Sequence, residues 1–376
     1  RAQYREHWVS RPAGQRSLTV FSWDDTLPVG TGPWRAAGVD ADGVSFERNE
    51  GYFAGEPSFD SLELRFVTAK EEQLARWNDG EGDVLAHLGP TELASVQQTP
   101  GTLYVSSGAQ VMFAAFNFQN PARAFPGLLG DVRIRRALSL AVDRDRYASG
   151  VFLNMIRANA AGTIAQPWAH NPEITSPGRD LERARDLLTE AGLTDLNNDG
   201  FLEDFNGERL TFSAIVRDDA HPGLVRLLEG VREDFAGIGA AFDLRVLSPA
   251  DFTATWVESR NYDLIAYSYP VYPGFTDFDL YGSNFDIRIN PQGWNPGGYA
   301  NEYADDLLKR LLVTVDPEMQ RDLLFEFQQV VDDDLFGLWL GFPAELVITR
   351  NELRGYQPNT YHSTWNTRLL WRETSG

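Results

Sequence analysis

Residues 210–216 of this 376-residue chain read Leu-Thr-Phe-Ser-Ala-Ile-Val, with apolar side chains at positions 210, 212, 214 and 216. Such alternation is typical of a β-strand with one buried face. Apolar residues at helical spacing follow from Leu224 to Phe235, and a second alternating stretch runs from Phe242 to Val246. Strand, helix and strand in this order predict an α/β domain.

Apolar periodicity predicts further elements on both sides of this stretch. The predicted helices cover residues 69–80, 131–142, 143–152, 181–192, 303–313 and 317–336. The predicted strands cover residues 16–22, 44–48, 62–66, 83–85, 110–118, 262–269 and 338–342. Three prolines, Pro167, Pro172 and Pro177, punctuate a long loop, which we expect to be a crossing between domains.

Composition excludes several classes of partner and cofactor. The chain has 33 basic and 54 acidic residues and a net charge of −21, so nucleic acid and anionic membranes are poor partners for it. No stretch approaches the roughly 20 apolar residues of a membrane span. The chain has no cysteine, which removes disulfides, zinc fingers and iron–sulfur clusters. Its five histidines are scattered, and this gives little support to a zinc or nickel site.

Residues 28–34, Pro-Val-Gly-Thr-Gly-Pro-Trp, form a turn cluster between two predicted strands. Their Gly-Thr-Gly begins like a dinucleotide-binding loop, but Arg35 stands where the third glycine is needed. The cluster is therefore interpreted as a structural turn. Paired acids at 24–25 and 332–334 are interpreted as helix caps and solvated ends, although a hydrolase with a dispersed acid pair stays an alternative.

Four segments together resemble one family. Residues 28–34 are followed by Phe-Glu-Arg-Asn-Glu-Gly-Tyr at 46–52, by Asp-Val-Arg-Ile-Arg-Arg-Ala-Leu-Ser-Leu-Ala-Val-Asp-Arg at 131–144, and by Asp-Leu-Glu-Arg-Ala-Arg-Asp-Leu-Leu-Thr-Glu-Ala-Gly at 180–192. In this order they resemble the signatures of the family 5 extracellular solute-binding proteins, the peptide, nickel and oligosaccharide receptors of ABC importers.

The resemblance implies a two-lobed, periplasmic-binding-protein-like α/β fold (type II, cluster C-like). We expect one lobe from residues 1–165 plus 345–376 and the other from 166–344. Family members carry a longer segment before the Gly-Thr-Gly turn, so an N-terminally truncated chain without its leader is expected. The implied protein is a monomeric receptor rather than an enzyme. It would be periplasmic or lipid-anchored at the cell surface, and its partners would be the membrane subunits of an ABC transporter.

The resemblance makes oligopeptide the leading ligand class. Peptide receptors of the family usually carry Asp-Pro in a segment where a nearby Asp takes the ligand's amino group. Here residues 272–279 read Tyr-Pro-Gly-Phe-Thr-Asp-Phe-Asp, and Asp277 is the nearest match. This departure and the ten tryptophans keep an oligosaccharide ligand as the alternative, with a secreted hydrolase as the alternative of another class.

Candidate ligand contacts cluster after the predicted strand 262–269, where α/β folds place their ligand crevices. Aromatic side chains offer broad contact to apolar or sugar surfaces, and Arg217, at the end of its strand, can bind a carboxylate with two hydrogen bonds. Core packing is the alternative explanation for the aromatic residues, and a surface ion pair for Arg217. The candidates are Trp168, Arg217, Tyr267, Tyr269, Tyr272, Phe275, Asp277 and Trp294.

Residues 195–201 read Asp-Leu-Asn-Asn-Asp-Gly-Phe and follow the first half of an EF-hand-type calcium loop. The candidate ligands are Asp195, Asn197, Asp199, the carbonyl of Phe201, and Asp204, with Glu203 as an alternative to Asp204. An Asx-rich turn without an ion is the other interpretation. No cofactor is required, so a calcium ion here would be structural.

Overall fold

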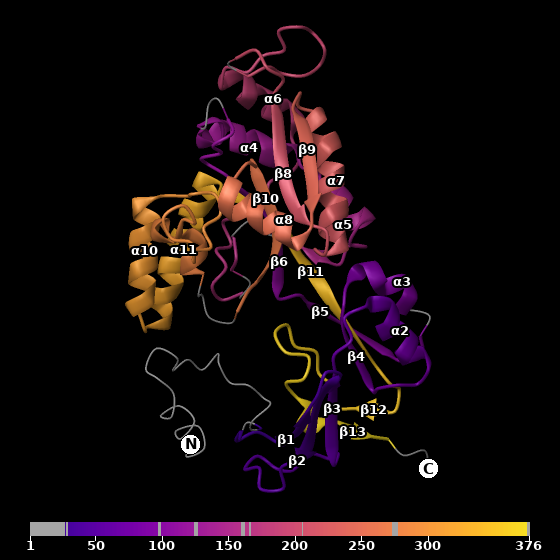
Figure 1. The fold of residues 1–376 in the computed structure, drawn as a ribbon. Helices are drawn as coiled ribbons and strands as arrows, with labels where there is room; N and C mark the ends of the chain where they lie inside the picture. The colour runs from indigo at the N-terminus through magenta and orange to yellow at the C-terminus, as the bar shows by residue number, and fades with distance from the viewer. Residues whose placement is uncertain are drawn as a thin grey trace. The chain divides into compact units, whose positions relative to one another are not determined.

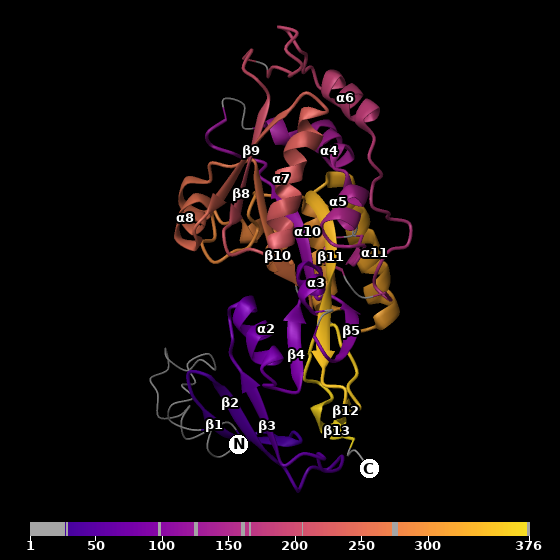
Figure 2. The same ribbon diagram turned by 90° about the vertical axis from the view of Figure 1, so that its right-hand side faces the viewer.

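The computed structural model describes residues 27, 29–96, 99–123, 127–158, 162–164, 167–204, 206–272 and 277–373. The chain folds into two compact units, shown in Figures 1 and 2. The first comprises Arg1–Ala86, Ser95–Tyr104 and Val347–Gly376, and the second comprises His87–Ala94 and Val105–Leu346. The predicted strand at 16–22 lies outside the described residues.

The lobe bounds expected from the resemblance, 1–165 plus 345–376 and 166–344, do not coincide with these units and stay a prediction. The main difference is residues 105–165, which group with the second unit. They do so because β6 (Gln110–Phe116) pairs along its whole length with β10 (Leu264–Pro270). Three strands each run across a boundary between the units' residue ranges: β4 (Val84–Leu88), β5 (Thr102–Ser107) and β11 (Gly337–Thr349).

The first unit contains an antiparallel sheet of β1 (Trp34–Val39), β2 (Gly43–Arg48) and β3 (Ser61–Arg65). The turn cluster lies at its start, where the Asn49 side chain donates to the Gly32 carbonyl at 2.8 Å. This bond joins the first two family-like segments, 28–34 and 46–52.

A helix and a small ladder complete the first unit. Helix α2 (Lys70–Asn78) buries Trp77, and the Arg350 guanidinium stacks 3.8 Å from the centre of the Trp77 ring. The remaining elements are α3 (Leu93–Val96), whose residues fall on both sides of a unit boundary, and the pair β12 (Leu353–Arg354) and β13 (Trp371–Arg372).

The second unit is built around a mixed sheet whose strand order is β11-β6-β10-β8-β9. Strands β8 (Thr211–Arg217) and β9 (Ala241–Leu247) are parallel, and β10 is parallel to β8. Strand β6 is antiparallel to both β10 and β11, and the short β7 (Ile156–Arg157) pairs with β11. The strands predicted at 210–216, 242–246 and 262–269 are thereby confirmed within one or two residues.

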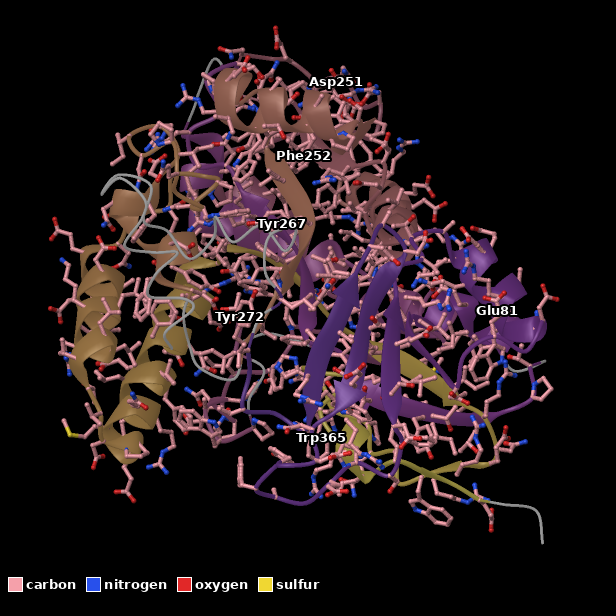
Figure 3. The ribbon with its side chains drawn as sticks, turned by 60° about the horizontal axis from the view of Figure 1, so that its bottom comes forward. Glu81, Asp251, Phe252, Tyr267, Tyr272 and Trp365 are labelled. Atoms are coloured by element: carbon pink, nitrogen blue, oxygen red, sulfur yellow. The ribbon has the colours of Figure 1, made fainter. Side chains whose placement is uncertain are left out.

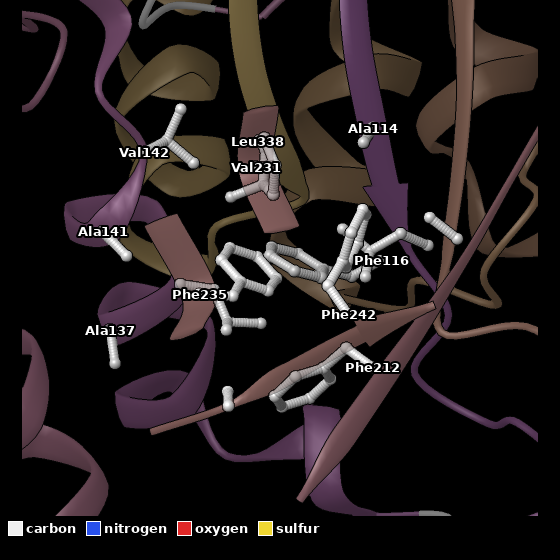
Figure 4. Close-up of a cluster of buried hydrophobic side chains, with 14 of the residues drawn as sticks. Ala114, Phe116, Ala137, Ala141, Val142, Phe212, Val231, Phe235, Phe242 and Leu338 are labelled. Carbon is white, nitrogen blue, oxygen red and sulfur yellow. The ribbon is translucent and has the colours of Figure 1, made fainter. Parts of the chain in front are cut away.

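Helices α4 (Val132–Ala141), α6 (Leu181–Glu190) and α7 (Pro222–Ala236) cover one face of this sheet (Figure 1). Side chains of Asp131 and Asp180 cap two of them at their N-termini by accepting backbone N–H bonds. Their apolar stripes and one face of the strands bury a core that we call the α7-side core. Figure 4 shows the rings of Phe212, Phe235 and Phe242 at its centre, with Phe235 edge-on to both neighbours.

Helices α10 (Glu302–Val313) and α11 (Pro317–Asp334) pack on the other face, in what we call the α11-side core. This core is rich in aromatic residues, among them Phe113, Phe336 and Trp339. The helices predicted at 303–313 and 317–336 are confirmed. The predicted strand 338–342 is the first part of the longer β11.

Several short helices connect these elements. They are α5 (Arg144–Gly150), α8 (Pro249–Thr253), a π-helical turn (Ala254–Ser259), α9 (Phe278–Tyr281) and 3₁₀ turns at Pro90–Glu92, Leu128–Gly130, Ser283–Phe285 and Thr367–Leu369. Among the residues that the structure describes, no helix has the length and apolar character that a membrane crossing requires.

Candidate functional site

Three parallel strands of the second unit, β8, β9 and β10, end at one edge of the sheet. Arg217 at the end of β8 lies opposite Leu247 at the end of β9, and both strands run in the same direction as β10. Open α/β sheets bind ligands outside the carboxyl ends of their strands. The residues that follow these ends, 217–220, 247–248 and 270–272, therefore form the candidate site, which we call the carboxyl edge.

Arg217 lies at this edge, where it forms an ion pair with Asp219. Its Nε donates to Oδ1 of Asp219 at 2.7 Å, and its Nη2 donates to Oδ2 of the same carboxylate. Hydrogen bonding between them lowers the pKa of Asp219 and raises that of Arg217. Both side chains are about half exposed to solvent. A ligand carboxylate can therefore reach the guanidinium fork, but it has to replace Asp219.

Tyr267 and Tyr269 lie on β10 and point into the α11-side core. The Tyr267 ring stacks edge-on against Phe113 at 4.7 Å, and its enclosed hydroxyl has no hydrogen-bond partner among the described residues. Burial raises the pKa of the Tyr267 hydroxyl well above its ordinary value. For Tyr267 the structure thus favours core packing, the alternative considered for the aromatic candidates.

Asp277 forms a buried polar cluster with Tyr269. The Tyr269 hydroxyl donates to Oδ1 of Asp277 at 3.1 Å, and Asp277 is only 3% exposed. Burial raises the pKa of Asp277 to about 6, although hydrogen bonds from Thr163 and Tyr269 oppose this. The carboxylate is therefore held by two neutral hydroxyl donors. Phe275 lies outside the described residues.

The other aromatic candidates differ in exposure. Tyr272, which is labelled in Figure 3, follows β10 and is 55% exposed. Trp168 and Trp294 are also about half exposed, and the Trp294 ring packs on Trp256 at 5.5 Å. Trp256 lies on the π-helical turn after β9 and was missed by the sequence reasoning, although its spacing of four from Phe252 indicates that both lie on one helix face.

The predicted calcium loop brings three carboxylates together. Ligand oxygens of Asp195, Asp199 and Glu203 all lie within 4.8 Å of one another. Isolated bridges from Thr194 to Glu203 and from Glu203 to Arg209 place Glu203 behind the loop, where it is 6% exposed. This grouping contains two of the predicted ligands, with Glu203 in place of Asp204.

Asp204 instead forms a separate turn, because its side chain accepts backbone bonds from Asn206 and Glu208 at 2.8 and 3.0 Å. Asn197 lies inside the loop and donates through its amide to Oε1 of Glu203 at 2.7 Å. Phe201 donates its backbone N–H to Asp199, whose other oxygen pairs with Arg209 at 2.6 Å. The Arg209 cation occupies one acceptor that a metal would use.

The sequence is similar to one family of known proteins. Residues 12–287 match the model described as "Bacterial extracellular solute-binding proteins, family 5 Middle". The "Probable di/tripeptide-binding protein 5" of Pseudomonas aeruginosa is 26% identical over 348 residues, which are 90% of this chain and 60% of that protein. The "Dipeptide-binding protein" of Escherichia coli is 22% identical over 88% of this chain and 59% of its own length. The chain thus spans about 60% of these relatives.

Solved structures share the fold. NikZ from Campylobacter jejuni in complex with Ni(L-His) superposes with a TM-score of 0.77 at 21% identity, covering 93% of this chain and 70% of NikZ. The oligopeptide-binding protein AppA from Bacillus subtilis in complex with a nonapeptide gives a TM-score of 0.71 at 19% identity, covering 91% and 66%. These likenesses confirm the predicted periplasmic-binding-protein-like α/β fold.

Proposed function

Since the chain belongs to the family 5 bacterial extracellular solute-binding proteins, we propose that it is an extracytoplasmic receptor that binds an oligopeptide and delivers it to an ABC transporter. Family membership also confirms the prediction that it is a binding protein and not an enzyme, so the hydrolase alternative is dropped. Closure of the receptor on its ligand would be the state that the transporter's membrane subunits recognise.

The carboxyl edge supplies the particular residues to which we assign ligand binding. Arg217 and Tyr272 both follow the ends of parallel strands and are accessible there. We propose that Arg217 exchanges Asp219 for the C-terminal carboxylate of the peptide, and that the Tyr272 ring packs on a ligand side chain. Asp277 would act behind them by holding Tyr269. Ligand contacts from Trp168, Tyr267, Phe275 and Trp294 stay predictions.

An oligosaccharide is the competing ligand. The exposed Tyr272 ring suits a sugar face as well as an apolar side chain, and Asp277 is buried and so less suited to take an amino group at the edge. Calorimetry with pools of di-, tri- and pentapeptides and with β-glucan oligosaccharides separates the two ligand classes. Saturable binding of peptides is expected; binding of the oligosaccharides alone would replace the peptide proposal by its competitor.

Three variants locate the site once a peptide ligand is found. Tyr272→Ala is expected to weaken binding about tenfold, through loss of one aromatic contact. Arg217→Gln is expected to weaken a peptide with a free carboxylate by about the same factor, but not its C-terminal amide. Tyr303→Ala is the matched control, since Tyr303 is a half-exposed tyrosine on α10. Equal affinities in all three variants would contradict the placement of the site.

We further propose that the receptor acts as a monomer in the periplasm or at the cell surface, where a lipid anchor would hold it. We also propose a structural calcium ion held by Asp195, Asp199 and Glu203, with the carbonyl of Phe201 and the Asn197 side chain completing its oxygens. Support for the ion comes from the convergence of the three carboxylates. The amide of Asn197 would have to turn its oxygen toward the ion.

A further inference from the structure

A hollow of about 170 Å³ opens in the second unit, and none of the residues that line it belongs to the carboxyl edge. It is bounded by the end of α4, the start of α5, residues 175–177, the end of α11 and Trp339 of β11. Strand β11 runs in the same direction as β10, because both are antiparallel to β6. Trp339 pairs with Phe113 of β6, which pairs in turn with Tyr267 in the middle of β10. The polar residues lining the hollow are Arg136, Ser139, Arg144, Thr175 and Asp332.

The guanidinium of Arg144 is the main charged group that lines this hollow. Its Nε donates to the Trp339 carbonyl at 3.1 Å, while Nη1 and Nη2 donate to the carbonyl and hydroxyl of Ser139 at 2.8 and 3.1 Å. All three acceptors are neutral. A guanidinium has five N–H donors, so two remain for another acceptor. Burial lowers the pKa of Arg144 to about 10, which leaves it charged at neutral pH.

Other enclosed arginines of this unit are satisfied differently. Arg123 forms an ion pair with Asp263, a carboxylate that is almost fully buried. Arg135 donates hydrogen bonds to the carbonyls of Asp334, Leu129 and Gly130. Its guanidinium also stacks over the Phe118 ring. Among the described residues, Arg144 has no carboxylate oxygen within ion-pair distance, and Asp234 acts on it only as a more distant charge. Its charge therefore faces the hollow without a local counterion.

The rest of the lining adds a second cation and two hydroxyls. Arg136 is exposed at the mouth of the hollow. Burial and the charge of Asp333 raise the pKa of the neighbouring Asp332, and the charge of Arg136 opposes this shift. Two arginines against one aspartate leave one positive charge in excess. The Thr175 and Ser139 hydroxyls can donate as well. Such a set of forked cations and hydroxyls suits a small anion with several oxygens.

We propose that this hollow binds a tetrahedral oxyanion of the size of sulfate or phosphate. The two spare N–H groups of Arg144 hold it from within, and Arg136 holds it at the mouth. Asp332 stays beside Arg136 and limits the affinity, because it repels the anion. The bound anion would tie α4, α5, β11 and α11 together at this point. The site lies outside the proposed ligand edge and does not depend on the transport proposal.

The test is calorimetric titration of the whole chain with sodium sulfate and, separately, sodium phosphate, with ionic strength held constant by sodium chloride. Saturable binding with one anion per chain is expected for both. A crystal grown with selenate should show an anomalous peak in the hollow. An absence of saturable heat for both anions at millimolar concentration would overturn the proposal.

Variants at the mouth distinguish a built site from an adventitious ion only. Arg136→Gln is expected to weaken sulfate binding about tenfold, and Thr175→Val about threefold, through loss of a charged and a neutral hydrogen bond. Both positions are exposed, so both variants should fold, whereas Arg144→Gln removes bonds between α5 and β11. Arg183→Gln, which removes the same charge on exposed α6, should bind sulfate as the parent does. Equal weakening by Arg136→Gln and Arg183→Gln would mean an adventitious ion only.

Discussion

The two cores that flank the sheet of the second unit differ in chemistry. The α7-side core is aliphatic and phenylalanine-rich, with Tyr147 as a buried tyrosine among its residues. The α11-side core contains the buried Tyr262, Tyr281 and Tyr299 and is joined by the partly buried Tyr267 and Tyr269. The hydroxyls of Tyr269, Tyr281 and Tyr299 donate to Asp277, Thr163 and Asp334 respectively. We infer that the first core chiefly stabilises the fold, while the second also holds the strand ends that present ligand contacts.

The largest effect on stability is expected from removing a buried side chain of the α7-side core. Phe235→Ala removes a fully buried ring between Phe212 and Phe242 and should lower the free energy of unfolding by about 3–5 kcal/mol. Urea denaturation measures the change. Val246→Ala, at a half-exposed position of β9, is the control and should change stability by less than about 0.5 kcal/mol. A loss below about 1 kcal/mol for Phe235→Ala would break the distinction between the two cores.

The α11-side core should show a pH dependence that comes from Asp277. Its folded pKa of about 6 exceeds the ordinary 3.8, so between these values the folded state holds a proton that the unfolded state has lost. Stability contributed by this group is therefore complete below about pH 4 and is lost as pH rises to about 6. The loss is about 3 kcal/mol, since one unit of pKa corresponds to about 1.4 kcal/mol.

Asp277→Asn tests this dependence, because asparagine keeps an acceptor for the Tyr269 hydroxyl and does not titrate. Urea denaturation at pH 4, 5, 6 and 7 should show parent and variant diverging as pH rises, with the variant gaining in relative stability. Parallel stability curves for the two proteins would show that Asp277 ionises without penalty, and the α11-side core would then resemble its neighbour in this respect.

A smaller effect is expected from the loop at 195–203, which lies outside both cores. If calcium binds there, a free concentration of one hundred times its Kd stabilises the chain by about 2.7 kcal/mol. EDTA should therefore lower the melting temperature, and Asp199→Ala should abolish that response. Asp204→Ala is the matched control, because Asp204 belongs to a separate turn. A melting temperature indifferent to EDTA would remove the ion.

Local patterns were sufficient for most elements of the second unit. The alternation at 210–216 predicted β8, and apolar periodicity predicted helices at 131–142 and 181–192 that the structure confirms as α4 and α6. Each of these signals depends on neighbours within a few residues. The family resemblance extended them to a complete fold, because its segments keep their order along the chain.

Other features depend on residues far apart in the sequence, and no local pattern contains them. Asp277 accepts a hydrogen bond from Thr163, more than one hundred residues earlier in the chain. The hollow at Arg144 needs α11 and β11, nearly two hundred residues away. Spacing could therefore propose an acidic loop and an aromatic stretch, but it could not decide which side chains face outward.

Hydrogen exchange with and without ligand tests the assignment of ligand binding to the carboxyl edge most directly. With a peptide that binds in calorimetry, slower amide exchange is predicted at residues 217–220 and 270–272, where β8 and β10 end. The segment 195–204 serves as an internal reference and should exchange at an unchanged rate. Protection confined to other segments, with residues 217–220 and 270–272 unaffected by saturating peptide, would contradict the account.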